Sequence, residues 1–393
     1  MSIYLNALGL VCPLGHDHAA ISRRLYAGDS GVRASDRHLA GQMLALGSIT
    51  LAESGLPSVM HLPLRDQSRN NRLALAALER IRPETDAAIA RFGAHRVGII
   101  IGTSTSGIAE GEAAFAHAAQ HGSFPAHFHY GQQELGSVAA ALAQTLGVSG
   151  PAYVHSSACA SSAKAMASAA RLLNMGLCDA VISGGVDSLC GFTIAGFSAL
   201  ESVSASRCNP LSANRNGINI GEGAALFLMS RQEATVSLRG WGESSDAHHI
   251  SAPDPSGTGA RLAIEKALAR AQIKSGEIDY INLHGTATLQ NDAMESQLIA
   301  ALFGHTVAVS STKPLTGHAL GAASAVEAGL CWLAMQDDQG NLPPHLWDGV
   351  ADPALPPLQL VAPGQRLGRP LRLALSNSFA FGGSNAALVF GRS

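Results

Sequence analysis

Residues 152–164 read Ala-Tyr-Val-His-Ser-Ser-Ala-Cys-Ala-Ser-Ser-Ala-Lys, a run in which a short strand leads through a turn into a helix. The strand is predicted over Ala152 to His155 and the helix over Ala160 to Met175, whose small residues allow close packing. Gly176 is a suitable helix end. Free amide groups at a helix start stabilise a thiolate and a developing oxyanion. Cys159 is therefore a candidate nucleophile, although a cysteine among alanines is more often a packing residue.

A second stretch has the same plan of strand, loop and small-residue helix. Residues 307–323 read Val-Ala-Val-Ser-Ser-Thr-Lys-Pro-Leu-Thr-Gly-His-Ala-Leu-Gly-Ala-Ala. Upstream of it, Ile278 to Gly285 reads as a strand ending in a turn, as Val97 to Thr103 does in the first half of the chain. The repetition predicts two related halves of a layered α/β protein.

The junction between the halves is predicted between Ser230 and Ser237. We assign residues 1–233 to an N-terminal half that carries Cys159, and residues 234–393 to a C-terminal half that carries two candidate histidines. Other predicted elements are a helix over Gln132–Leu146 and strands over Asp179–Gly185, Leu371–Ser376 and Ala386–Phe390.

Composition favours a large, well-packed enzyme. The chain has 393 residues, of which 47% are hydrophobic and 14% charged, and its formal net charge of −3 offers no electrostatic reason to expect nucleic acid. No apolar run approaches the length of about 18 residues that a membrane-spanning helix needs, and no signal peptide is evident, so we expect a cytoplasmic protein without a membrane span. Six scattered cysteines without a CxxC pair favour reduced thiols and no metal site.

Two histidines lie in turns that resemble each other. His284 follows an apolar run in Leu283-His-Gly-Thr-Ala-Thr288, and His318 lies at a helix entry in Thr316-Gly-His-Ala-Leu320. Either histidine alone is more often structural, since imidazole fills many polar niches. Two of them in matching turns, in a chain that also has Cys159 at a helix entry, predict a joint catalytic site.

These motifs resemble the β-ketoacyl-acyl carrier protein synthases, specifically the elongating condensing enzymes of types I and II. The resemblance spans most of the chain. Its motifs are Cys12-Pro-Leu-Gly15, Ser157-Ala-Cys-Ala160, Gly221-Glu-Gly-Ala224, His284-Gly-Thr-Ala-Thr288, Ser311-Thr-Lys-Pro-Leu-Thr-Gly-His318 and Asn377-Ser-Phe-Ala-Phe-Gly-Gly-Ser-Asn385.

The resemblance implies a thiolase-like fold, with two pseudo-symmetric halves stacked as α/β/α/β/α layers and a dimer that helps form the acyl pocket. It also implies a ping-pong reaction. Cys159 takes an acyl group from acyl carrier protein, and malonyl carrier protein then loses carbon dioxide and attacks the Cys159 thioester. No prosthetic group is expected, because phosphopantetheine arrives on the carrier protein.

The resemblance also implies roles for residues around Cys159. His284 and His318 would donate hydrogen bonds to the malonyl thioester oxygen, and the amides of Cys159 and Phe381 would form a second oxyanion hole. Lys313 and Glu327 match an ion pair beside the second histidine, whose implied role is orientation and tuning of the site. By sequence alone, such charges are usually solvated surface groups.

Further roles follow for the flanking motifs. Thr286 and Thr288 match hydroxyls that contact pantetheine, and Asp292 and Glu295 match acidic residues that support the His284 loop, although either pair could simply cap a helix. Phe379 and Phe381 resemble an aromatic gate over the nucleophile; the alternative is a pair of core aromatics. Candidates for docking the acidic carrier protein, which could equally be ordinary solvated arginines, are Arg65, Arg69, Arg72 and Arg207.

The chain departs from common family patterns at three places: Ala380 stands where many relatives have glycine, Leu289-Gln-Asn291 replaces Pro-Ala-Gly, and Cys208-Asn-Pro-Leu211 replaces Arg-Pro-Phe. These features look closer to ketosynthases of specialised polyene pathways, including aryl polyenes, than to housekeeping fatty acid synthesis. The dimer partner is predicted to be a second copy or a related chain-length factor.

Four alternatives stay open. A noncatalytic chain-length partner would share the fold, but the retained Cys159 argues against it. Degradative thiolases use a second cysteine near the C-terminus, which residues 376–385 lack. Initiating ketosynthases pair cysteine with one histidine and an asparagine, so His318 favours elongation. A cysteine hydrolase is the remaining enzymatic alternative.

Overall fold

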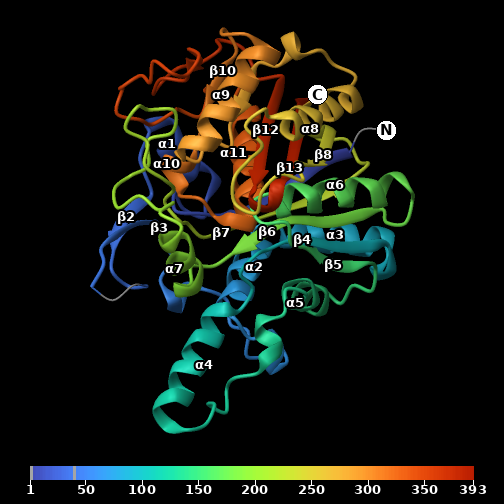
Figure 1. Cartoon of the computed structure of the whole chain (residues 1–393). Coiled ribbons are helices and arrows are strands. Elements are labelled where there is room, and N and C mark those ends of the chain that lie inside the picture. Colours follow the sequence, from blue (N-terminus) through green and yellow to red (C-terminus); the bar gives the residue numbers. More distant parts are fainter. Residues whose placement is uncertain (1–2, 39–40) are drawn as a thin grey trace.

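The computed structural model describes residues 3–38 and 41–393, and within these ranges eleven strands form one continuous mixed sheet (Figure 1). The strands of the N-terminal half are β1 (Ile3–Val11), β4 (Val97–Gly102), β5 (Ala152–His155), β6 (Ala180–Asp187) and β7 (Gly223–Ser230). Those of the C-terminal half are β8 (Val236–Ser245), β9 (Tyr280–Asn282), β10 (Ala308–Ser310), β11 (Gln359–Leu360), β12 (Leu373–Ala380) and β13 (Ser384–Arg392). A separate hairpin joins β2 (Val32–Ser35) to β3 (Leu44–Gly47).

The two halves have the same strand topology. The N-terminal order is β1-β7-β6-β4-β5, and the C-terminal order is β8-β13-β12-β9-β10, with β11 added outside β10. β4 is parallel to β5 and β6, and β9 is likewise parallel to β10 and β12, whereas β7 and β13 are antiparallel to both of their neighbours. The halves join where Ile3 and Tyr4 of β1 pair with Leu238 and Ser237 of β8. The repeat expected from the sequence is therefore present in the backbone.

Helices pack against the faces of the sheet, so that helices and strands form layers (Figure 1). The helices are α1 (His18–Ala27), α2 (Arg69–Glu79), α3 (Arg82–Phe92), α4 (Ile108–His121), α5 (Ser137–Leu146), α6 (Ser161–Asn174), α7 (Gly191–Ala199), α8 (Thr258–Ala271), α9 (Leu289–Phe303), α10 (Lys313–Thr316) and α11 (Ala323–Met335). α6 and α11 share one core cluster with both halves of the sheet, while α2 and α5 cover the outer face of one half and α8 and α9 that of the other. This is the predicted α/β/α/β/α arrangement.

Small side chains allow α6 and α11 to occupy the middle layer. α6 reads Ser-Ser-Ala-Lys-Ala-Met-Ala-Ser-Ala-Ala, and most of its residues are buried. α11 is buried along almost its whole length, including Glu327. Because neither helix presents a wide polar face, both can lie between sheets.

Two of the predicted elements have other bounds in the structure. The helix predicted over Gln132–Leu146 is wrong in its first part, because Tyr130–Gln133 forms a 3₁₀ turn and α5 begins only at Ser137. The Gln132 side chain accepts a hydrogen bond from the His129 amide and so closes that turn. The strand predicted over Leu371–Ser376 begins at Leu373 and continues to Ala380.

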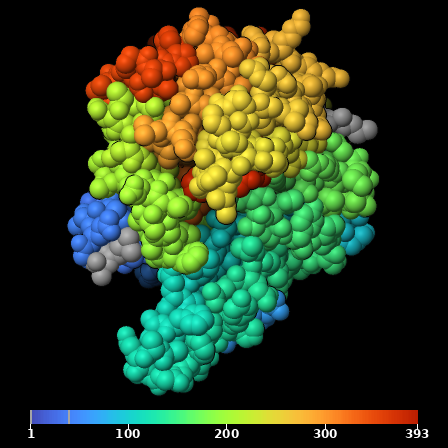
Figure 2. All heavy atoms as spheres, viewed as in Figure 1, coloured from blue at the N-terminus to red at the C-terminus, as the bar shows by residue number. Residues whose placement is uncertain are grey.

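One segment projects from the body of the protein (Figures 1 and 2). We call residues 108–130, which comprise α4 and the loop after it, the arm. Phe115 packs edge-on against Phe124 at 5.1 Å between ring centroids, yet the two residues are 56% and 50% exposed. Exposed aromatic clusters commonly mark interaction surfaces. In the described part of the chain, no helix is both long and apolar enough to span a bilayer.

Candidate active site

Cys159 lies in the turn between β5 and α6, as the sequence predicted. The turn is stabilised by Ser161, whose hydroxyl donates to the Ala158 carbonyl at 2.6 Å and accepts from the Ser157 amide at 2.8 Å. Ala158 has a φ of 45°, a left-handed conformation that is unfavourable for alanine and must be maintained by its surroundings. From the other half, the Ser324 hydroxyl donates to the Cys159 carbonyl at 2.9 Å. The side chain of Cys159 is thus presented from a fixed backbone.

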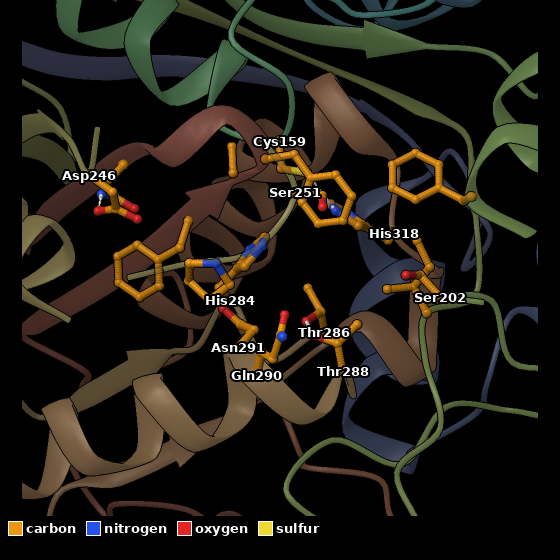
Figure 3. A pocket seen from close by; sticks show the side chains of 17 residues that line it. Cys159, Ser202, Asp246, Ser251, His284, Thr286, Thr288, Gln290, Asn291 and His318 are labelled. Carbon is orange, nitrogen blue, oxygen red and sulfur yellow. Dashed lines mark hydrogen bonds between the residues drawn. The ribbon is translucent and has the colours of Figure 1, made fainter. Parts of the chain in front are cut away.

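Both predicted histidines meet this cysteine (Figure 3). His318 Nε2 lies 3.0 Å from Cys159 Sγ, a hydrogen-bond contact between residues 159 positions apart in the sequence. The rings of His284 and His318 are 5.5 Å apart between centroids and nearly perpendicular. One ligand-type atom from each of the three residues lies within 4.8 Å of the others, and all three residues are buried. The C-terminal half thus supplies two imidazoles to a sulfur atom of the N-terminal half.

Backbone contacts fix His318. Its amide donates to the Asn219 carbonyl at 2.6 Å, and its carbonyl accepts from the Gly221 amide at 2.8 Å. The preceding Gly317 has a φ of 71° and approaches the Gly221 backbone so closely that a side chain at position 317 would crowd it. His318 is therefore bound to a segment of the N-terminal half.

The His284 loop is held by the two acidic residues that the sequence singled out. Glu295 accepts from the amides of His284 and Gly285 at 2.8 and 2.7 Å. Asp292 accepts from the Ala287 amide at 3.2 Å. Burial raises the pKa of Glu295 to about 7, with the amide hydrogen bonds acting in the opposite direction. Both carboxyl groups thus bind the backbone that carries His284.

Lys313 and Glu327 form a fully buried ion pair rather than solvated surface charges. Lys313 Nζ lies 2.5 Å from Glu327 Oε1 and also donates to the His284 carbonyl at 2.5 Å, and the side chains are only 1% and 3% exposed. Burial raises the pKa of Glu327, which the Lys313 charge opposes. The ammonium group therefore connects α10, α11 and the His284 loop.

Burial dominates the electrostatics of the site. It lowers the pKa of His284 and of His318 well below the usual range, and the Lys313 charge adds to this effect. Both imidazoles are therefore neutral at neutral pH. Burial also raises the pKa of Cys159 to about 12, although the Lys313 charge and the amides of Cys159 and Phe381 lower it. Burial therefore outweighs the stabilisation of a thiolate that was expected from the helix start.

A small cavity of about 70 Å³ opens beside these groups. Thr286 and Thr288 line it, with hydroxyl oxygens 2.9 Å apart, and so do Phe379 and Phe381. In Figure 2, the region where its lining segments meet shows as a hollow between yellow, yellow-green and red atoms. The cavity thus brings hydroxyl and aromatic side chains next to the buried thiol and imidazoles.

Other lining residues were missed by the sequence analysis. Phe197 of α7 lines the cavity, and its ring centroid lies 5.4 Å from that of Phe381. Asp246 receives hydrogen bonds from Asn385 and from the Asp254 amide, and its own amide donates to the Gly383 carbonyl. No local pattern could have revealed them, because only folding brings these distant segments to the cavity.

The predicted docking arginines fall into two groups. Arg69 is bound to Glu222 and Glu53, and Arg72 to Glu53 and backbone carbonyls, so the donors of both guanidinium groups are already used inside the N-terminal half. Arg65 pairs with Glu134 at the surface, and Arg207 is exposed. The internal pairs could not be read from the sequence, because Glu222 lies 153 positions from Arg69.

Within residues 3–38 and 41–393, the Cys159, His284 and His318 cluster is the one group of side chains spaced to hold a metal ion. Its closest pair is a sulfur–imidazole hydrogen bond of 3.0 Å. All six cysteines lie in the described part of the chain and are buried, free thiols. The absence of a metal stays a prediction.

Comparisons with known proteins agree with this geometry. Residues 2–234 match the family model for the beta-ketoacyl synthase N-terminal domain, and residues 235–346 match the model for the C-terminal domain. The chain is 31% identical to nodulation protein E of Rhizobium sp. (strain N33), over 99% of this chain and 98% of that protein. It is 29% identical to 3-oxoacyl-[acyl-carrier-protein] synthase 2 of Synechocystis sp. (strain ATCC 27184 / PCC 6803 / Kazusa), over 99% and 97% of the two chains.

Solved structures extend the similarity to the fold. The ketosynthase ApeO of Xenorhabdus doucetiae, solved in complex with its chain length factor ApeC, aligns with a TM-score of 0.93 and 44% identity, covering 100% of this chain and 98% of that one. A beta-ketoacyl synthase from Burkholderia phymatum STM815 aligns with a TM-score of 0.87 and 27% identity, covering 100% and 99%. The chain therefore belongs to the beta-ketoacyl synthase family and has its thiolase-like fold.

Proposed function

We propose that this protein is an acyltransferase of the 3-oxoacyl-[acyl-carrier-protein] synthase type, which lengthens a carrier-bound acyl chain by condensation with a malonyl group. The observation that carries the proposal is the 3.0 Å contact between Cys159 Sγ and His318 Nε2, with His284 beside them in a buried pocket. A nucleophile and two neutral hydrogen-bond donors are the groups that this chemistry needs.

In the first half-reaction, the Cys159 sulfur loses its proton and attacks the carbonyl carbon of an acyl thioester. A new carbon–sulfur bond forms, the bond to the carrier sulfur breaks, and the departing carrier thiolate takes up a proton. The amides of Cys159 and Phe381 stabilise the oxyanion of the intermediate. His318, in contact with the sulfur, hydrogen-bonds it as charge develops.

In the second half-reaction, the malonyl thioester oxygen accepts hydrogen bonds from His284 and His318. Carbon dioxide leaves, and the carbanion attacks the Cys159 thioester, forming a carbon–carbon bond and returning the sulfur to the thiol after protonation. Neutral imidazoles suit this role because they donate a proton in a hydrogen bond without losing it. Thr286 and Thr288 bind the pantetheine arm, and Phe379 and Phe381 gate the pocket.

Acyl carrier protein is the partner that brings both substrates on phosphopantetheine, so no resident prosthetic group is required. Of the predicted docking residues, Arg207 and Arg65 stay candidates, since Arg69 and Arg72 are engaged internally. The cytoplasmic location also stays part of the proposal.

A second copy of the chain or a related chain-length factor completes a dimer. Two surfaces support this: β5 ends the sheet with one edge unpaired in the described part of the chain, and the arm presents exposed phenylalanines. The similar proteins ApeO and the ishigamide ketosynthase were both solved with chain length factors. Co-purification with candidate partners distinguishes the homodimer from the heterodimer.

We place the protein in polyene or related specialised chain elongation, with aryl polyene synthesis as the specific candidate. The identity of 44% to ApeO exceeds the 26% to the ishigamide ketosynthase and the 27% to the Burkholderia synthase, which supports the ApeO-like assignment. Mass spectrometry of products from varied acyl carriers identifies the primer.

The decisive experiment supplies carboxyl-labelled malonyl carrier together with acyl carrier. A condensing enzyme releases labelled carbon dioxide and forms β-ketoacyl carrier. A noncatalytic chain-length partner forms no acyl-Cys159. A thiolase-type enzyme extends the chain with an acetyl thioester and therefore needs no malonyl group. A hydrolase releases free acid without carbon dioxide. Any of these three results would reject the proposal.

A further inference from the structure

A buried carboxyl group outside the pocket is hydrogen-bonded to the segment that carries His318. Asp187, the last residue of β6, is 0% exposed. It accepts hydrogen bonds from six donors, which are the hydroxyl groups of Thr103, Ser104 and Thr105 and the amides of Ser104, Thr105 and Gly321. Burial raises the pKa of Asp187, and the surrounding hydroxyls and amides oppose that rise by hydrogen-bonding the carboxyl group.

The Gly321 contact is the one that reaches the C-terminal half. Its amide donates to Asp187 Oδ2 at 2.6 Å. A side chain at position 321 would overlap Asp187 Oδ2 and the Ser104 amide, each at 2.8 Å from the added carbon, so only glycine permits this approach. The neighbouring Leu320 has a φ of 48°, a strained conformation that the surrounding contacts must hold.

His318 lies between two attachments to the N-terminal half. On one side it exchanges backbone hydrogen bonds with Asn219 and Gly221. On the other side, three residues later, Gly321 is bound to Asp187. The strained Leu320 lies between His318 and the second attachment, so release of Gly321 would let this segment relax and move the imidazole relative to Cys159.

We propose that Asp187 is a positioning residue for the condensation, which sets the distance between His318 Nε2 and Cys159 Sγ by anchoring the Gly321 amide across the boundary between the two halves. Asp187 touches neither the sulfur nor the imidazole and acts through the His318 segment. The inference rests on the proposed function, because the effect is expressed in the Cys159 chemistry.

Asparagine at this position makes a sharp test. Oδ1 of Asp187 faces the amides of Ser104 and Thr105, and Oδ2 faces the amide of Gly321. Whichever way the side-chain amide of an asparagine turned, its NH₂ group would oppose at least one backbone N–H. The less costly orientation opposes one amide rather than two, and it therefore releases Gly321.

The experiment is a double-mutant cycle between Asp187→Asn and His318→Ala, read by condensation rate and by the rate of Cys159 alkylation with iodoacetamide. A misplacement of about 1 Å costs on the order of 100-fold in rate, so Asp187→Asn is expected to lower kcat by about that factor with little change in KM. In the His318→Ala background it should cost less than about twofold, because both changes remove the same contact.

The matched control is Asp66→Asn. Asp66 is another buried carboxyl group of the N-terminal half, 3% exposed and bonded to Ser137, and it does not line the pocket. This change should lower thermal stability while leaving kcat within about twofold. Equal multiplicative losses from Asp187→Asn in both backgrounds, or a kcat effect no larger than that of Asp66→Asn, would overturn the inference.

If Asp187→Asn does not fold, Ser104→Ala replaces it in the same cycle. The Ser104 hydroxyl contacts both Asp187 and the Gly321 amide, so its loss weakens the same anchor and leaves the carboxylate in place. A loss of about threefold that disappears in the His318→Ala background supports the inference, and an unchanged rate rejects it. Wild-type protein that fails to condense would instead reject the proposed function.

Discussion

The β5–α6 unit of the N-terminal half and the β10–α11 unit of the C-terminal half have the same place in the same topology, yet they present different chemistry. Cys159 follows the end of β5 by four residues, whereas His318 follows the end of β10 by eight. The additional residues form α10, which carries Lys313. One unit thus presents a buried thiol at a helix start, and the other presents an imidazole and a buried cation.

The outer strands of the two units also differ. β10 is fully buried and is covered by β11, whereas β5 is partly exposed and ends the sheet. An unpaired strand edge readily pairs with another chain. The outer strand of the C-terminal unit is thus covered by a short strand of the same chain, whereas, within the described residues, the outer strand of the N-terminal unit, which leads to Cys159, leaves its own edge open to a partner.

Replacing Cys159, the proposed nucleophile of the N-terminal unit, should cause the largest loss of condensation rate. Cys159→Ser is expected to lower condensation by roughly 10⁴-fold or more, because a hydroxyl in this pocket has no comparable nucleophilicity. Product formation measured by mass spectrometry checks this. Cys190→Ser, which changes a buried thiol that is not among the pocket-lining residues, should retain activity. Chain extension by Cys159→Ser would refute the role of the sulfur.

Loss of one charge should lower the free energy of unfolding more in the buried Lys313–Glu327 pair than in an exposed ion pair. Lys313→Met leaves Glu327 buried and unpaired, and it is expected to cost about 3–5 kcal/mol in the free energy of unfolding. Urea denaturation measures the loss. Arg82→Met, which breaks the exposed Arg82–Asp86 pair, should cost no more than about 1 kcal/mol. Equal losses would contradict the buried assignment.

Replacing His284 or His318 by alanine tests the role of each imidazole in the reaction. His318→Ala or His284→Ala is expected to lower decarboxylative condensation by roughly 10²–10³-fold, the usual cost of one oxyanion donor. His305→Ala, at a surface histidine, is the control. Release of labelled carbon dioxide gives the rate, and an unchanged rate in either pocket variant would show that its imidazole is not a donor.

The protonation of Cys159 gives the next largest effect. Its pKa of about 12 means that the thiolate fraction rises about tenfold per pH unit through the neutral and mildly alkaline range. Alkylation by iodoacetamide should therefore accelerate about 100-fold between pH 7 and pH 9. A plateau below pH 9 would show that the helix start and the histidine lower the pKa more than burial raises it.

Carrier docking should give the smallest effect. Arg207→Glu is expected to raise KM for acyl carrier protein by roughly fivefold, about 1 kcal/mol for an exposed charge, and to spare a small thioester substrate. Arg23→Glu, an exposed arginine on α1, is the control. Equal losses with both substrates would exclude a docking role for Arg207.

The local sequence pattern was sufficient to predict those elements whose own residues form the motif. The strand, turn and small-residue helix around Cys159 were predicted close to their observed bounds, and the two histidine turns were recognised from motifs. The pairing of Lys313 with Glu327 was implied only by the family resemblance, because the residue types alone favour a solvated surface, and the structure adds that the pair is buried. The start of α5 was missed because the Gln132 side chain closes a 3₁₀ turn before it, and the extent of β12 to Ala380 was missed as well.

The sequence by itself determined the α/β repeat and pointed to Cys159, His284 and His318 as one candidate site, because periodicity and motif chemistry are local properties. Only the tertiary structure decided that Arg69 and Arg72 are engaged by internal acids, that Phe197 and Asp246 line the pocket, and that Asp187 holds Gly321. It also decided that burial raises the pKa of Cys159. The physical reason is that burial and hydrogen bonding depend on groups far apart in the chain, whose distances are set only when both halves pack together.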